Sequence, residues 1–367
     1  MTVLGTAGSA APASRGRTLA EVYRHFGEVD AAGASPLHHH VAVALSGSEE
    51  ALQAIATMPA RTRRPPVVLA ALHDLALAGR APELAAAYAA ADGDAAARAA
   101  VDTLRRMTGP VASVAARRQP QTLETARCAV LYPAVAEAAR RLGAGAVGLV
   151  DVGCSPGLDL HVDLVGISYG DGRSLGDPSS PVQLSSSVVG HRPVPAQAVP
   201  EVVARIGVDR DPVDLTDPDD ARWLRACVPP DQPERAARLA AELALAATAP
   251  PLLLRGDPVA ALPDAVARVP TDVPAVVTTT WALSRLPLES RLRFLHRLDE
   301  AAGGRALAWV SVEGVGVAPA VPTLGDRRAS GHSIIGLAVF GRSALHAEAI
   351  GRCWSRGRLL AWLAGAR

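Results

Sequence analysis

The chain contains no lysine and no asparagine among its 367 residues. Without lysine it has no side chain that forms a Schiff base, and it cannot build the G-x-x-x-x-G-K-[ST] phosphate loop. Its four cysteines lie far apart without a C-x-x-C pair, which disfavours a zinc site or a disulfide-rich secreted scaffold. No apolar run approaches the roughly 18 residues that cross a bilayer, and the N-terminus has no signal-peptide core. We therefore expect a cytoplasmic protein with no membrane partner.

The charge of the chain is almost balanced. The 37 basic and 36 acidic residues give a formal net charge of +1 and are interspersed along the whole length. Such a chain has no broad positive field to attract a polyanion, so nucleic acid is not an expected partner. The hydrophobic fraction of 49% is that of a folded protein, and the length suits two lobes.

The apolar pattern changes along the chain from helical spacing to short runs that alternate with helical stretches. The first pattern is represented by Leu69, Leu72 and Leu75. The second is typical of a parallel sheet covered on both faces. The predicted segments are a flexible N-terminus at 1–17, a helical substrate-binding cap at 18–142, and a Rossmann-like domain at 143–367 with an insertion or lid at 166–200.

The predicted fold class is therefore α/β, a doubly wound and mostly parallel sheet with an N-terminal all-helical domain. Asp231 and Glu234 are spaced as a capping pair at the start of a predicted helix at 235–246. The pattern predicts helices at 131–142, 235–246 and 288–302, and strands at 146–152, 201–208, 252–254, 275–280, 306–312 and 334–340.

The stretch LVDVGCSPGLDLHVD, residues 149–163, places an acid and a glycine turn directly after the first predicted strand. In a doubly wound sheet, this turn is where backbone can approach a ligand, because glycine has no side chain and tolerates positive φ. Gly153 and Gly157 are spaced for that role, while Ser155 stands where many dinucleotide fingerprints have a glycine. This favours a nucleoside without phosphates, and a turn that binds no ligand is the alternative.

Two further acids follow predicted strands. Asp209 ends one strand, and Asp257 follows the next. Carboxylates accept hydrogen bonds, so they suit a neutral nucleoside and repel phosphate. Asp209 lies 52 positions beyond Gly157, whereas the corresponding acid usually lies about 20 positions on, so the insertion must account for the excess. Asp209 could instead simply end its strand, with Asp214 capping the turn that follows.

The glycine turn and the order of these acids resemble the class I S-adenosylmethionine-dependent methyltransferases. The resemblance implies that S-adenosylmethionine is the cofactor and that no metal is needed. It implies that the turn faces the amino-acid part of the cofactor, that Asp209 binds the ribose and that Asp257 meets the adenine. The predicted cofactor-binding residues are Asp151, Gly153, Ser155, Gly157, Asp209, Asp257 and Trp281, the last just after the fourth strand.

Nearly the whole chain from about residue 20 also resembles an actinobacterial group, the domain of unknown function 2332 family. The matching stretches include ASPLHHH, QTLETARC, RIGVDRDPVDLTDPDDARWLRACVPPDQPER and WVSVE. The resemblance implies a helical cap on a methyltransferase-type domain and no established reaction. Arg356-Gly357 stands where the family would have His-Gly, so we expect either a changed substrate pocket or a loss of activity.

Five residues are the candidate catalytic or substrate-binding groups. Glu124 and Arg127 are three apart on a predicted helix, so they share a face and either line the cleft or form an ordinary ion pair. His161 and Asp163 follow the glycine turn, where a histidine would be the general base or a structural side chain. Glu313 ends the fifth strand, at the edge where ligands bind.

The sequence thus predicts a methyltransferase-like enzyme that acts on a small molecule, either free or attached to a carrier. One alternative is the same fold used for an intramolecular cyclisation or elimination in specialised metabolism. The other is a binding or scaffold protein without catalysis. The His38-His39-His40 tract is expected to bind no metal, because adjacent helix positions point in different directions.

Overall fold

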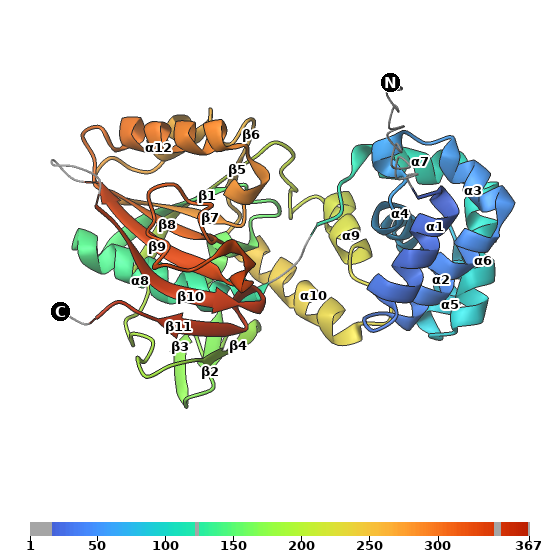
Figure 1. The fold of residues 1–367 in the computed structure, drawn as a ribbon, viewed down its shortest axis with the longest axis horizontal. Helices are drawn as coiled ribbons and strands as arrows, with labels where there is room; N and C mark the ends of the chain where they lie inside the picture. Colours follow the sequence, from blue (N-terminus) through green and yellow to red (C-terminus); the bar gives the residue numbers. More distant parts are fainter. Residues whose placement is uncertain (1–16, 122–124, 341–345, 366–367) are drawn as a thin grey trace, which may run out of the picture. The chain divides into compact units, whose positions relative to one another are not determined.

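The computed structural model describes residues 17–121, 125–340 and 346–365, and its packing divides the chain into two units (Figure 1). The helical unit consists of residues 1–120 and 226–233, and the sheet unit of residues 121–225 and 234–367. The division lies earlier than the predicted boundary at residue 142. The physical reason is that helix α8, Cys128–Leu142, is almost entirely buried and packs on strands of the sheet unit.

The helical unit is a bundle in which side chains cap several helix starts. Thr18, Ser35, Ser48 and Asp92 each accept a hydrogen bond from a backbone N–H in the first turn of the next helix. Helix α4 is buried along most of its length and so forms the centre of the bundle. The helices are α1 Leu19–His25, α2 Pro36–Gly47, α3 Glu49–Ala56, α4 Pro65–Leu77, α5 Pro82–Ala89, α6 Gly93–Arg106 and α7 Thr108–Arg117, with a π-helical turn at Phe26–Ala31.

A short segment from the second half of the chain completes the helical unit. The Asp231 carboxylate accepts hydrogen bonds from the Ser35 hydroxyl at 2.6 Å and the Leu37 amide at 2.9 Å. Asp231 therefore bonds to the first turn of α2, 194 residues away, and not within a capping pair with Glu234 as predicted. The amide of Gln232 adds a bond to the Ala34 carbonyl.

The sheet unit is built on an eleven-stranded, mostly parallel sheet within the described residues (Figure 1). The strand order is β3-β2-β4-β11-β10-β9-β8-β7-β1-β5-β6, and β6, β5, β1, β7 and β8 are parallel neighbours. The strands are β1 Ala146–Val152, β2 Gly166–Tyr169, β3 Arg173–Gly176, β4 Gln183–Val188, β5 Glu201–Asp209, β6 Leu252–Arg255, β7 Ala275–Thr280, β8 Leu307–Gly314, β9 Ser333–Phe340, β10 His346–Trp354 and β11 Leu359–Trp362.

Both faces of the central strands are buried, as expected for a parallel sheet. On β1, Val147 and Leu149 pack in the same core as α8, while Val150 and Val152 face the opposite core, which α11 and α12 cover. This alternation produces three layers, with the sheet between two helical layers. The remaining helices assigned in this half of the chain are α9 Pro218–Ala226, α10 Pro233–Thr248, α11 Leu262–Ala267 and α12 Leu288–Ala302.

The predicted insertion at 166–200 contributes to the sheet. Its three strands, β2 to β4, join the sheet at the far edge through the pairing of β4 with β11. The glycine turn leads into a short 3-10 segment, η4 Leu158–Leu164, that is kinked at His161. The chain thus passes from β1 to β5 through η4 and an added three-stranded ribbon, which accounts for the long spacing between Gly157 and Asp209.

Candidate functional site

The carboxyl edge of the sheet gathers most of the predicted site residues. From β1 the sheet extends to β5 and β6 on one side and to β7 and β8 on the other. Ligands of doubly wound sheets bind beyond the strand ends at this change of direction. Asp151 lies near the end of β1, Asp209 ends β5, Asp257 follows β6, Trp281 follows β7 and Glu313 lies near the end of β8.

The backbone N–H groups of the glycine turn are all bonded within the protein. Those of Gly153 and Cys154 donate to the Val208 carbonyl at 2.8 and 3.4 Å, and that of Gly157 donates to Cys154. The Ser155 amide donates to the Asp209 carboxylate at 3.2 Å, and Pro156 has no N–H. The turn therefore offers no free amide to the oxygens of a phosphate, in contrast to the Gly-rich phosphate loops.

The two glycines are required for the local fold. Gly153 and Gly157 have φ values of 78° and 80°, in the region that favours glycine. A Cβ on Gly153 would lie 2.8 Å from the Cβ of Ala282, and a Cβ on Gly157 would contact Leu253 and Pro251. Protein atoms thus cover the side of each glycine where a side chain would stand.

Asp151 is a buried acid that holds its proton near neutral pH. Its side chain accepts a hydrogen bond from the Thr278 hydroxyl on β7 at 2.7 Å. Burial, with the neighbouring Asp159 carboxylate as a second cause, raises the pKa of Asp151 to about 7. Burial also raises the pKa of Asp159, against the opposing effect of the Arg127 guanidinium.

Arg127 connects these acids to an aromatic side chain. Its Nη1 lies 3.5 Å from the Asp159 carboxylate, and its guanidinium carbon lies 5.5 Å from the centre of the Trp281 ring. Trp281 has a φ of 52°, which is rare outside glycine, and its indole N–H donates to the Ser333 hydroxyl at 2.8 Å. Strained residues of this kind concentrate at functional sites.

Glu313 is the second acid at this edge with a raised pKa. One carboxylate oxygen accepts hydrogen bonds from the amides of Ala282 and Leu283, at 3.0 and 2.9 Å. The other oxygen is buried and has no partner among the described residues. Burial raises the pKa of Glu313 to about 7, because the amide bonds offset only part of the desolvation of its charged form.

Asp209 and Asp257 hold the backbone at the ends of their strands. Asp209 accepts from the amides of Ser155 and Asp211. Asp257 accepts from the amides of Val259 and Ala260 and pairs with Arg210 at 2.7 Å, and its pKa is lowered by these bonds despite partial burial. Each carboxylate can still accept further hydrogen bonds, since its two oxygens together offer about four acceptor positions.

The structure puts His161 and Asp163 in contacts that fix η4. His161 Nε2 lies 2.9 Å from the Ala249 carbonyl, and burial lowers its pKa. Asp163 forms a two-pronged ion pair with Arg205 on β5, with both N–O distances at 2.7 Å. These contacts favour positioning roles for both residues.

Sequence reasoning missed a polar cluster at the same edge of the sheet. The Asp326 carboxylate lies 2.9 Å from His332 Nε2 and 2.6 Å from Arg352 Nε. His332 directly precedes β9, next to Ser333, the partner of Trp281. Its members are 6 and 26 positions apart in the sequence, so no local motif indicates the cluster.

Glu124 and Arg127 are the remaining predicted site residues. Glu124 lies outside the described residues, and Arg127 lies in a short 3-10 turn before α8.

Among the described residues, no three His, Cys, Asp or Glu side chains gather as a metal site, and the four cysteines are free thiols. None of the described helices has the length and apolar character needed to cross a membrane.

The described fold and site define an α/β protein whose mostly parallel sheet carries acids and one strained tryptophan at its carboxyl edge. The chain belongs to a bacterial family of uncharacterized proteins, DUF2332, whose sequence model matches residues 20–362. No curated protein and no solved structure matches it.

Proposed function

We propose that the sheet unit binds S-adenosylmethionine at its carboxyl edge and that the chain is a methyltransferase-like enzyme acting on a small molecule. One observation carries this proposal. In chain order, β1, β5, β6, β7 and β8 form a 3-2-1-4-5 arrangement, which begins the strand order of doubly wound nucleotide-binding sheets. An acid stands at the carboxyl end of each of the first three strands.

The polar groups at this edge suit a nucleoside better than a nucleotide. The turn amides at 153–157 are used internally, and the acids Asp209 and Asp257 would repel phosphate. Ribose hydroxyls and an adenine amino group are donors, and Asp209 and Asp257 have acceptor positions left for them. Asp151, together with Asp159, would attract the positively charged part of the cofactor when ionised.

When bound, S-adenosylmethionine supplies a methyl group on a positively charged sulfur. The chain's own contribution is alignment, since transfer requires the acceptor atom to lie in line with that bond. Arg127 and Trp281 would orient the substrate above β1 and β7. Glu313, whose pKa of about 7 suits proton exchange near neutral pH, would accept a proton from the acceptor atom, and the His332–Asp326 pair offers a second proton acceptor at this edge.

Isothermal titration calorimetry of the purified full-length chain with S-adenosylmethionine tests this proposal. We expect a one-site isotherm that Asp209→Asn and Asp257→Asn each weaken about tenfold, as for loss of a charge-assisted hydrogen bond. Asp299→Asn, on the exposed side of α12, removes the same charge and should bind like the parent. A flat titration with folded parent protein, and with S-adenosylhomocysteine as well, refutes the proposal.

A second candidate is acid–base chemistry without methyl transfer, such as an intramolecular cyclisation or elimination. Two buried carboxyls with pKa values of about 7, Asp151 and Glu313, favour it. Mass spectrometry of small molecules that co-purify with the chain distinguishes the two. Recovered S-adenosylhomocysteine supports methyl transfer, whereas an unmethylated substrate that the chain isomerises supports the second candidate.

A further inference from the structure

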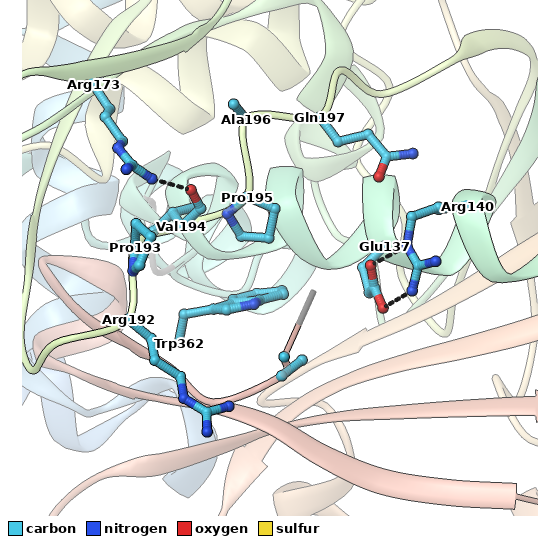
Figure 2. A pocket seen from close by; sticks show the side chains of 12 residues that line it. Glu137, Arg140, Arg173, Arg192, Pro193, Val194, Pro195, Ala196, Gln197 and Trp362 are labelled. Carbon is cyan, nitrogen blue, oxygen red and sulfur yellow. Dashed lines mark hydrogen bonds and ion pairs between the residues drawn. The ribbon is translucent and has the colours of Figure 1, made fainter. Parts of the chain in front are cut away.

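The sheet unit contains a pocket far from the carboxyl edge. It has a volume of about 410 Å³ and lies between the C-terminal half of α8, the loop at 192–197 and the end of β11 (Figure 2). This volume is within the usual range of about 300 to 1,000 Å³ for small-molecule sites.

The pocket opens at the opposite edge of the sheet from the glycine turn. β11 runs antiparallel to β10, and the pairings from β10 back to β1 make β11 opposite in direction to β1. Trp362, the last residue of β11, therefore lies at the amino-terminal edge of β1. Along α8, Arg127 and Arg140 are separated by about 20 Å at 1.5 Å per residue. The two sites are thus spatially separate.

The lining of the pocket carries an excess of positive charge. Three arginines and one glutamate line it, a formal net charge of +2. The glutamate, Glu137, is already bound by Arg140 at 2.8 Å and by Arg141 at 2.7 Å, which hold its pKa below the usual range despite burial. Arg173 donates to the Val194 carbonyl at 2.9 Å, and Arg192 donates to the Leu363 carbonyl. Arg173 also lies 3.8 Å from the Asp171 carboxylate, which offsets part of its charge. The carbonyl partner of Arg192 does not neutralise its charge, and Arg192 has no acidic partner among the described residues.

Apolar side chains form most of the rest of the pocket lining. Trp362 forms the floor in Figure 2, and Pro193, Val194 and Pro195 lie above it, with the Glu137–Arg140 pair to one side. The Trp362 indole and the Gln197 amide make no hydrogen bond to another described residue. Donors without acceptors beside an aromatic floor favour a ligand that has a flat body and acceptor oxygens.

We propose that this pocket binds a small organic anion, in which a carboxylate or phosphate group is attached to a flat apolar body. The anionic group is held by Arg192, because a guanidinium without an acidic partner binds such groups through charge-assisted hydrogen bonds, and Arg173 lies on the same side of the pocket (Figure 2). The flat body stacks on Trp362. This proposal does not depend on the reaction at the carboxyl edge.

Calorimetric titration of the full chain with four probes tests the chemistry of the site. The probes are 1-naphthoate, 1-naphthyl phosphate, the neutral 1-naphthalenemethanol and inorganic phosphate. We expect one or both naphthyl anions to bind at least tenfold more tightly than the neutral probe and than phosphate alone. The tighter anion identifies the head group. Equal binding of the neutral probe overturns the role of charge, and equal binding of inorganic phosphate overturns the role of the apolar body.

Substitutions locate the binding. Arg192→Gln, at an exposed position, should weaken the tighter anion about tenfold, whereas Arg192→Lys, which keeps the charge, should stay within about threefold. Arg293→Gln on α12 removes the same charge outside the pocket and should bind like the parent. Incorporated 5-fluorotryptophan gives a direct readout, since the ¹⁹F signal missing in Trp362→Phe must shift on titration of the parent. An unmoved Trp362 signal, or unchanged binding by Arg192→Gln, refutes the proposal.

Discussion

At the scale of single residues, the carboxyl edge contains two acids, Asp151 and Glu313, whose ionisation is disfavoured by burial. Asp151 and Glu313 have similar pKa values for the same physical reason, burial, but different partners: a threonine hydroxyl for Asp151 and two backbone amides for Glu313. An acid whose folded-state pKa is raised lowers the stability of the folded chain as the pH rises from its unfolded-state pKa toward its folded-state pKa. Natural proteins keep such acids mainly where function needs them.

Glu313→Gln should make the chain more stable at pH 8 and leave it unchanged near pH 4.5. The folded-state pKa is raised from 4.5 to about 7, so the stability present below pH 4.5 is lost as pH rises toward 7. Glutamine retains the acceptor oxygen for the Ala282 and Leu283 amides and carries no charge. We expect a gain on the order of 2 kcal/mol at pH 8, measured by urea unfolding.

The matched control is Glu289→Gln, because the Glu289 side chain is 86% exposed on α12. Its unfolding free energy should change little at either pH. A Glu313→Gln variant that is less stable than the parent at pH 8 would mean that the ionised carboxylate is stabilised in the fold, contrary to the raised pKa.

At the scale of elements, sequence periodicity located the central strands well. The bounds predicted for β1, β7 and α12 match the structure, because uninterrupted apolar runs and a regular leucine stripe give strong signals. The ribbon β2–β4 was interpreted as an insertion or lid, since its strands are short and rich in serine and glycine. Its pairing with β11, about 170 residues later, has no local signal. The Asp326–His332 cluster was not predicted for the same reason, because its third member, Arg352, is distant in sequence.

Asp231 allows the capping pair predicted from the sequence to be compared with the long-range contact to Ser35 and Leu37 in the structure. Asp231→Ala removes the bonds to Ser35 and to the Leu37 amide at the start of α2, and we expect a loss of about 2 kcal/mol. Glu234→Ala, at an exposed position, should change stability by less than about 0.5 kcal/mol. Thermal unfolding followed by circular dichroism compares the two. A larger loss for Glu234→Ala would favour the capping pair predicted from the sequence.

At the scale of the whole molecule, the chain packs as two compact units, and the second unit is interrupted in sequence by part of the first. Chains of this kind often unfold in more than one step. We expect two calorimetric transitions. Asp231→Ala should lower the midpoint of one of them, which is thereby assigned to the helical unit.

Gly148→Ala should lower the other transition. A Cβ on Gly148, in the middle of β1, would lie 2.4 Å from the Val269 side chain, and the buried strand leaves little room to shift. Overpacking of this kind costs about 1 to 3 kcal/mol. Gly145→Ala, before β1 with nothing within 4 Å of its Cβ, is the control. If both Gly148→Ala and Asp231→Ala move the same single transition, the units unfold together.

The interleaved order of the two units also constrains how the chain is made. The helical bundle cannot be completed until residues 226–233 have been synthesised, and residues 121–225 of the sheet unit are synthesised before them. At roughly 5 to 20 residues per second, that wait is about 5 to 20 seconds. During it, the nascent bundle has His73 without its Ala226 carbonyl and α2 without its Asp231 partner. Translation speed across this stretch, and chaperones near the exit tunnel, would therefore influence the yield of native protein.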